Sequence, residues 1–138
     1  MKTMSNSVLV NQVTKQYIRE DLPTFNVGDN ISVTYFIDGG RTQTFKGIVL
    51  SLKGAGVSRT FCVRKIGADN IGVEKILPLH SPIIKSIKVE KTGVVRKSKV
   101  YYMRNRIGKL AMKIKEGKKI AKVEEIKEVT AEVENKPE

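Results

Sequence analysis

A dense run of basic residues with two embedded tyrosines lies in the C-terminal half of the chain. Between residues 85 and 119, thirteen lysines and arginines stand against two acids, Glu90 and Glu116. Tyr101 and Tyr102 are adjacent and have basic residues on both sides. Closely spaced cations neutralise phosphates, and aromatic rings offer flat faces for bases or cations. This combination predicts contact with a nucleic acid.

The charge of the protein is concentrated in that run. The 138 residues have a formal net charge of +12, whereas residues 85–119 alone carry thirteen bases against two acids, or +11. Residues 120–138 are acidic, with six acids and three bases. A run of like charges repels itself unless a polyanion neutralises it, which favours nucleic acid over a solvated lysine-rich face. A membrane partner is not expected, because the run has no sustained apolar face.

Catalytic and metal-binding patterns are weak. His80 is the only histidine and stands beside Ser81, but adjacent residues do not form a nucleophile–base pair. One histidine and one cysteine do not make a metal site, and no cofactor is expected. Gly54-Ala55-Gly56 lacks the Gly-Lys-Ser/Thr ending of a phosphate loop. We expect His80 to be a corner residue that bonds the backbone and a phosphate, and Cys62 to be an inert packing thiol.

The elements that must position the basic run are short strands separated by glycine turns. Strands are expected over residues 31–37, 42–53, 60–66 and 73–77, and a fifth runs from Ile83 through Val89 and continues to Val95. On the third strand, Phe61 and Val63 face one side while Cys62 and Arg64 face the other. Gly47 suggests a bulge or sharp bend. The pattern predicts one domain built on an antiparallel sandwich or small barrel.

The two ends of the chain are expected to differ from this body. Val10, Val13 and Tyr17 have helical spacing, so a helix is predicted over residues 7–19, capped by Ser7 and ended before Pro23. Beyond residue 97 the strand pattern fades, and the arm is expected to be extended or irregular, with a helical turn or two near residues 110–114. Residues 120–138 suit either an amphipathic helix or a solvated tail.

The chain is expected to act in the cytosol. A single cysteine excludes an internal disulfide and fits a reducing compartment. The sequence offers neither a signal-peptide pattern nor an apolar stretch of about 18 residues. RNA suits an irregular basic arm better than DNA does, because no helix-turn-helix or zinc-finger pattern supplies a recognition helix. Composition alone leaves that choice open.

An ordered set of short motifs carries a resemblance to a known family. The motifs are Pro23-x-Phe25-x-x-Gly28-Asp29, Phe45-x-Gly47-Ile48-Val49, Phe61-Cys62-Val63-Arg64-Lys65-Ile66, Gly72-Val73-Glu74, His80-Ser81-Pro82, Val95-Arg96-Lys97-Ser98-Lys99-Val100-Tyr101-Tyr102-Met103-Arg104 and Gly108-Lys109. Over residues 23–116 the chain resembles the bacterial large-subunit ribosomal protein L-nineteen family.

The resemblance implies a fold and a function. The fold is a mainly β, SH3-like antiparallel β-barrel with a short N-terminal helix and a basic, partly helical C-terminal extension. The resemblance and the charge distribution together divide the chain into an N-terminal helix and lead-in (1–22), a barrel (23–96), a basic rRNA-binding arm (97–119) and an acidic tail (120–138), and the tail is not part of the usual family pattern. The function is a structural, non-catalytic part of the large ribosomal subunit in the cytoplasm, near the interface with the small subunit. The implied partners are large-subunit rRNA, neighbouring ribosomal proteins and, through an inter-subunit bridge, small-subunit rRNA.

The candidate RNA-binding residues fall into two groups. The first lies in the arm and comprises Arg96, Lys97, Lys99, Tyr101, Tyr102, Arg104, Arg106, Lys109 and Lys113. The second lies on the barrel and comprises Arg64, Lys65, Arg41, Lys53, Arg59 and His80. The tyrosines either stack on RNA or anchor the arm to the barrel. The alternative function is a stand-alone SH3-like module that binds a protein and uses the basic arm for localisation.

Overall fold

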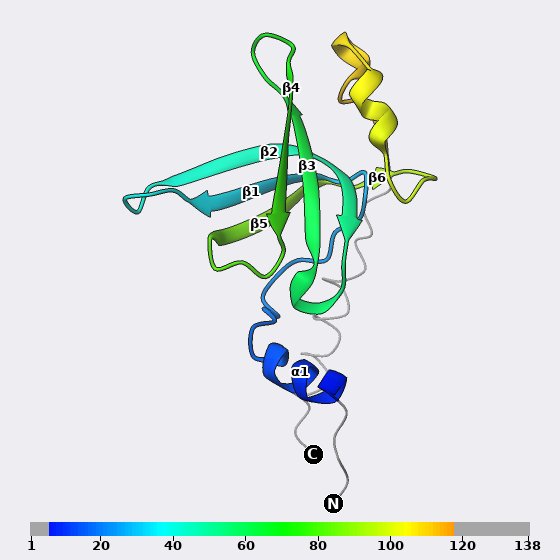
Figure 1. The fold of residues 1–138 in the computed structure, drawn as a ribbon. Coiled ribbons are helices and arrows are strands. Elements are labelled where there is room, and N and C mark those ends of the chain that lie inside the picture. Colours follow the sequence, from blue (N-terminus) through cyan, green and yellow to red (C-terminus); the bar gives the residue numbers. More distant parts are fainter. Residues whose placement is uncertain (1–5, 118–138) are drawn as a thin grey trace, which may run out of the picture.

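The computed structural model describes residues 6–117, which are mainly β-strand (Figure 1). The helix and strands, in chain order, are α1 (Asn6–Lys15), β1 (Asn30–Phe36), β2 (Thr42–Lys53), β3 (Thr60–Ile66), β4 (Gly72–Pro78), β5 (Ile84–Lys91), β6 (Gly93–Val94) and β7 (Lys115–Glu116). Three short 3-10 helices complete them: η1 (Gly56–Ser58), η2 (Tyr101–Asn105) and η3 (Gly108–Leu110). The first four predicted strands are confirmed to within one or two residues at each end.

Five strands form one antiparallel sheet in the order β4-β3-β2-β1-β5, and β6 pairs with β7 beside it. The hairpin between β1 and β2 turns at Gly39 and Gly40, whose φ angles of 81° and 76° suit glycine. The expected antiparallel β fold is thus confirmed. Within residues 6–117 no pairing of β4 with β5 closes the sheet into a barrel, so the sheet is open.

The sheet buries side chains on both of its faces, in two separate clusters. The first cluster comprises Phe25, Ile31, Val33, Tyr35, Phe45, Val49, Phe61, Val63, Leu77, Ile84 and Ile87. The second comprises Ile48, Leu50, Cys62, Val100 and Met103. Strand β2 therefore buries successive residues, which explains its unbroken apolar run at residues 48–50. The two predicted faces of β3 are confirmed, since Phe61 and Val63 lie in the first cluster and Cys62 in the second.

The bulge expected at Gly47 lies elsewhere. The pairing of β1 with β2 runs without a break through Gly47, and the register of β2 against β3 shifts between Val49 and Ser51 instead. Gly47 has a different role, because a Cβ atom there would overlap the backbone carbonyl of Arg64 on β3. The glycine permits close approach of two strands and does not itself bend one.

The N-terminal helix is shorter than expected and its apolar face is uncovered. Helix α1 begins at Asn6, so Ser7 lies inside it and not before it, and it ends at Lys15 and not at residue 19. A tight turn follows, in which Tyr17 and Ile18 donate backbone hydrogen bonds to Thr14 and Lys15. Tyr17 is 60% exposed, and Val10 and Val13 are each 58% exposed. Because these apolar side chains bury little surface, a short helix gains little stability from a further turn.

The fifth strand also ends earlier than expected. Strand β5 stops at Lys91, and the chain leaves the sheet at Thr92 to form β6, which pairs with β7 and not with β1. The reason is a local contact at Gly93, whose backbone N–H donates to the Asp29 carboxylate at 2.9 Å. A Cβ atom on Gly93 would overlap the carbonyl of Gly28. The chain is therefore drawn toward the segment before β1.

No helix within residues 6–117 is long and apolar enough to cross a membrane. In the same residues, no three His, Cys, Asp or Glu side chains come together as a metal site. The amphipathic helix or solvated tail considered for residues 120–138 lies outside the described residues, as do Lys118 and Lys119 at the end of the arm.

Candidate nucleic-acid interface

Residues 97–117 form a folded layer on the second face of the sheet. Val100 is fully buried, and its backbone N–H donates to the carbonyl of Leu50 at 2.9 Å. Met103 is 1% exposed beside it. The Tyr101 hydroxyl donates to Ser51 Oγ at 3.2 Å. Of the two expected forms, extended or irregular, the arm has the irregular one in these residues, because apolar side chains at intervals in the basic run pack it against β2. Of the helical turns expected near residues 110–114, η3 (Gly108–Leu110) only reaches the edge of that range, whereas η2 (Tyr101–Asn105) lies earlier in the chain and was not expected.

Glu74 on β4 holds two of the candidate RNA-binding arginines. Its carboxylate accepts two hydrogen bonds from Arg104, at 2.8 and 2.7 Å, and one from Arg64 at 3.0 Å. The hydrogen bond from Arg104, above all, lowers the pKa of the Glu74 carboxyl, and Arg64 adds to this. The Arg64 side chain is only 11% exposed, and it covers Gly72, where a Cβ atom would overlap the guanidinium. Arg64 is thus a structural residue in this fold.

The adjacent tyrosines face different partners. The guanidinium of Arg104 lies 4.5 Å from the Tyr101 ring centroid. The Tyr102 ring, which is 36% exposed, has the Arg106 guanidinium at 4.6 Å and Lys97 Nζ at 5.8 Å from its centroid. Such stacking orients a cation while leaving its charge available. Tyr101 anchors the arm, as one alternative held, and Tyr102 supports the cations that surround it.

Tyr102, Lys97 and Arg106 line an open groove of about 490 Å³, which we call the basic groove. Its lining residues are Val94, Val95, Arg96, Lys97, Tyr102, Arg106, Lys113, Ile114 and Lys115. Among these described residues there are five cations and no acid. Arg106 is oriented by a hydrogen bond from Nη1 to the Lys113 carbonyl at 3.2 Å. None of these five cations forms an ion pair with an acid within residues 6–117.

The remaining candidate residues of the arm lie outside the groove. Lys99 and Lys109 are exposed on either side of η2. Lys53 lines a separate small hollow together with Tyr101 and Arg104. The sequence analysis grouped Lys99 and Lys109 with the other cations of the arm because all belong to one stretch of chain, but neither lines the groove in the folded protein.

The candidates on the sheet are spread over several places. Arg41 is exposed after the β1–β2 turn, and Lys65 Nζ lies 4.8 Å from the ring centroid of Phe45. Arg59 and His80 line a different hollow, of about 160 Å³, at the end of the sheet near α1. His80 Nδ1 accepts a hydrogen bond from the backbone N–H of Arg19 at 3.1 Å, which confirms the expected corner role.

Two contributors escaped the sequence analysis. Lys115 at the start of β7 lines the groove together with Lys113. The alternation of Lys113, Ile114 and Lys115 was the signal in the sequence that could have placed both lysines on one side of an extended segment. Asp29 was recognised only as part of a motif. It is 3% exposed, and its carboxylate holds the backbone at Asn26 and at Gly93, where the arm leaves the sheet.

Comparison with known proteins gives the family. The family model described as Ribosomal protein L19 matches residues 8–117. The chain belongs to this family. It is 49% identical over 118 residues to the large ribosomal subunit protein bL19 of Borreliella burgdorferi, covering 83% of this chain and 97% of that protein. It is 49% identical over 113 residues to bL19 of Thermosipho melanesiensis (80% and 97%) and 48% identical over 110 residues to bL19 of Chloroherpeton thalassium (78% and 90%).

Membership of the L19 family confirms the expectations of a ribosomal protein, located in the ribosome in the cytoplasm and without enzymatic activity. The match ends at residue 117, so the acidic segment from residue 120 onward lies beyond it. It spans both strands that hold the arm, β6 and β7, and all five cations of the basic groove.

Proposed function

We propose that the chain is a constituent of the large ribosomal subunit that binds rRNA through the basic groove. The observation that carries this is the set of five cations gathered around Tyr102 with no acid among the groove's described lining residues. The name of the L19 relatives, large ribosomal subunit proteins, supports the choice of partner. An RNA backbone running through the groove would place phosphates against cations that form no ion pair within residues 6–117.

The packing of the arm supports this proposal energetically. A flexible basic tail loses conformational freedom when it binds, at a cost of about 0.5–1.5 kcal/mol for each long side chain that is ordered. Here Arg106 is already fixed by the Lys113 carbonyl and by the ring of Tyr102. The groove is thus preorganised for phosphate, and the exposed part of Tyr102 remains free to contact a ribose or base.

The finer parts of the assignment are proposals as well. We propose that the open sheet is a variant of the SH3-like barrel, with the barrel over residues 23–96 and the basic arm over residues 97–119. Arg104, Lys99, Lys109 and Lys53 then form a second row of contacts beside the groove. Arg59 and His80, at the opposite end near α1, suit a separate rRNA segment or the small subunit across the interface. The neighbouring ribosomal proteins would contact the uncovered apolar side chains of α1.

The salt dependence of RNA binding tests the groove. The affinity of the full chain for a large-subunit rRNA fragment is measured between about 50 and 200 mM salt. Each phosphate contact contributes about 0.7 to 0.9 to the slope of log affinity against log salt. Replacing Arg96, Lys97 and Lys115 together by alanine should therefore lower the slope by about 2.

A matched variant removes the same charge from another face. Lys15, Lys85 and Lys88 are exposed and lie outside the groove. Their triple alanine variant should weaken binding only through net charge and keep most of the slope. Equal slopes for the two triple variants would contradict the groove assignment. Salt-independent binding by the unaltered chain would favour the protein-interaction module instead.

A further inference from the structure

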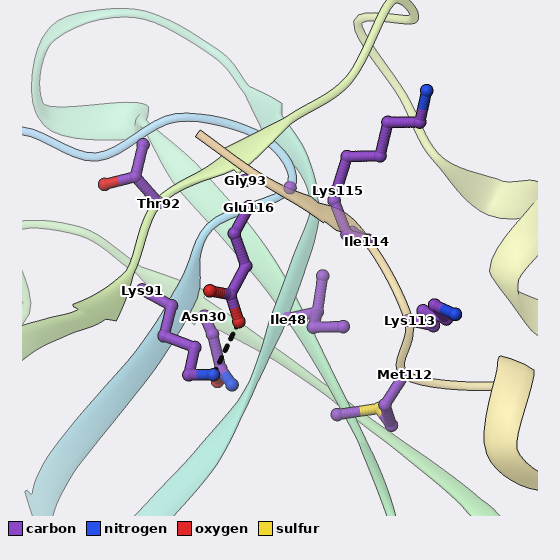
Figure 2. Close-up of a pocket in the computed structure, with 11 residues that line it drawn as sticks. Asn30, Ile48, Lys91, Thr92, Gly93, Met112, Lys113, Ile114, Lys115 and Glu116 are labelled. Carbon is purple, nitrogen blue, oxygen red and sulfur yellow. Dashed lines mark hydrogen bonds and ion pairs between the residues drawn. The ribbon is translucent and has the colours of Figure 1, made fainter. Parts of the chain in front are cut away.

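Another hollow adjoins the basic groove and shares part of its lining with it. Figure 2 shows the residues that line this hollow. Its volume is about 260 Å³, and it is bounded by the start of β1, the β5–β6 junction and the segment from Met112 to Glu116. Lys113, Ile114 and Lys115 line both the hollow and the groove. A strand of RNA lying in the groove would therefore pass directly beside this hollow.

The walls of the hollow combine apolar surface with hydrogen-bonding groups. Ile48, Met112 and Ile114 supply the apolar part. At its mouth, Lys91 Nζ lies 2.6 Å from Glu116 Oε1. Figure 2 shows the Glu116 side chain directed into the hollow toward Lys91, with Asn30 beside that pair, whereas the Lys115 side chain points away. Apolar walls with a few convergent polar groups are typical of small-molecule sites.

Asn30 provides a further polar group beside the Lys91–Glu116 pair. Its Oδ1 atom is buried and has no hydrogen-bond partner within residues 6–117. Buried polar atoms almost always have a partner. The terminal torsion of an asparagine is soft, so a turn of this amide toward the hollow would allow a ligand to supply the missing partner.

The hollow is small for a whole nucleotide. Sites for drug-sized ligands measure about 300–1,000 Å³, so a single flat ring system is the better fit. Proteins that read single-stranded RNA take up unstacked bases in such sites and bond their Watson–Crick edges. The neighbouring groove would hold the phosphates of the same strand.

We propose that this hollow binds one unpaired guanine of the RNA whose backbone lies in the basic groove. The guanine edge presents an acceptor, O6, followed by two donors, N1–H and the N2 amino group. The mouth of the hollow presents the complement, because Lys91 Nζ donates and the two oxygens of Glu116 accept. Adenine and uracil lack two adjacent donors for this carboxylate. The inference rests on the proposed function, since the groove must deliver the strand.

The test uses single-stranded RNA oligomers of about ten nucleotides, either all uridine or with one central guanosine. The affinity of the full chain for each is measured by fluorescence anisotropy at one salt concentration. A bidentate base contact is expected to favour the guanosine oligomer by about tenfold. An inosine oligomer, which lacks the N2 amino group, should lose part of that preference.

Glu116→Gln provides the decisive variant. Loss of a negative charge should by itself strengthen RNA binding, but loss of one acceptor oxygen should remove most of the preference for guanosine. Glu90→Gln is the matched control, because Glu90 is also exposed and paired with a lysine, Lys46, but lies outside the hollow. It should strengthen binding to both oligomers and keep their ratio.

The outcomes separate the inference from the function on which it rests. Equal affinity of the unaltered chain for both oligomers, or a guanosine preference that survives Glu116→Gln, would overturn the guanine site and leave the groove standing. Binding to neither oligomer nor to the rRNA fragment would overturn the proposed function itself.

Discussion

The carboxylate of Asp29 accepts a hydrogen bond from the backbone N–H of Gly93, which lies 64 residues further along the chain, at 2.9 Å. Its second oxygen accepts from the backbone N–H of Asn26 at 2.8 Å. The side chain thus joins the segment before β1 to the first residue of β6. Because β6 holds β7, this one carboxylate fixes both the start and the end of the arm to the sheet.

Replacement of Asp29 should therefore destabilise the protein. Asp29→Ala removes two charge-assisted hydrogen bonds and leaves two backbone donors without their partners, at a cost of about 3 kcal/mol in the free energy of unfolding. Asp29→Asn keeps one acceptor oxygen and should cost less. Urea denaturation measures both. Asp38→Ala in the exposed β1–β2 turn is the control, and equal effects at positions 29 and 38 would contradict the role given to Asp29.

Gly47→Ala should destabilise the sheet. A Cβ atom at this position overlaps the carbonyl of Arg64, so β2 and β3 must separate. Overpacking of this kind costs about 1–3 kcal/mol. Gly67→Ala is the matched control, since the nearest atom to a Cβ there is the Ile71 carbonyl oxygen at 3.4 Å. Thermal unfolding compares the two variants, and an unchanged melting temperature for Gly47→Ala would show that the strands have room to adjust.

The ion pairs of Glu74 should make stability depend on pH. The pKa of its carboxyl is lowered in the folded protein, chiefly by the hydrogen bonds from Arg104. The unfolded chain therefore binds the proton more readily. The stabilisation is present above the ordinary pKa of a glutamate and is lost as the pH falls through the lower, folded pKa.

Glu74→Gln is expected to flatten this dependence. Denaturation midpoints measured from about pH 7 to pH 3 should converge for the variant and the unaltered protein as the pH falls. Glu20→Gln, which changes an exposed carboxylate that forms no ion pair within residues 6–117, should track the unaltered protein. A constant difference between Glu74→Gln and the unaltered protein at every pH would count against the assignment.

Removal of residues 120–138 should leave incorporation into the large subunit intact. The family match and both groove-forming strands end by residue 117. Co-sedimentation of the shortened chain with large subunits after a high-salt wash measures incorporation. Loss of the shortened chain from the subunits would show that the acidic segment has a docking site of its own.

Local pattern was enough to predict the first four strands. The strands are bounded by turns rich in glycine, asparagine or, after the fourth, proline, and they carry β-branched residues, so local preference and tertiary structure agree there. The fifth strand was extended too far because Val94 and Val95 have strand character, whereas the distant carboxylate of Asp29 decides their position. The length of α1 was overestimated because helical spacing does not reveal whether another element covers the face it creates.

In the candidate site, too, local sequence predicted some features, and contacts between distant residues determined the others. Charge density pointed to a part of the chain in which Arg96, Lys97, Arg106 and Lys113 line one groove. Charge does not show which cations a carboxylate already occupies. Arg64 and Arg104 share Glu74, and this depends on the register that places Arg64 opposite Glu74 on paired strands. Such a register is a property of the folded sheet and not of any short segment.

The pairing of β6 with β7 has a consequence for the order in which the protein folds and forms the basic groove. Both walls of the basic groove exist only when residues 93–94 and residues 115–116 have met, and that meeting requires the sheet and Asp29 to be in place. A chain that has folded its sheet but not its arm carries the same charge and has no groove. Under the proposed function, such a chain would meet RNA through its net charge alone, and the preorganised site would appear only with the completed fold.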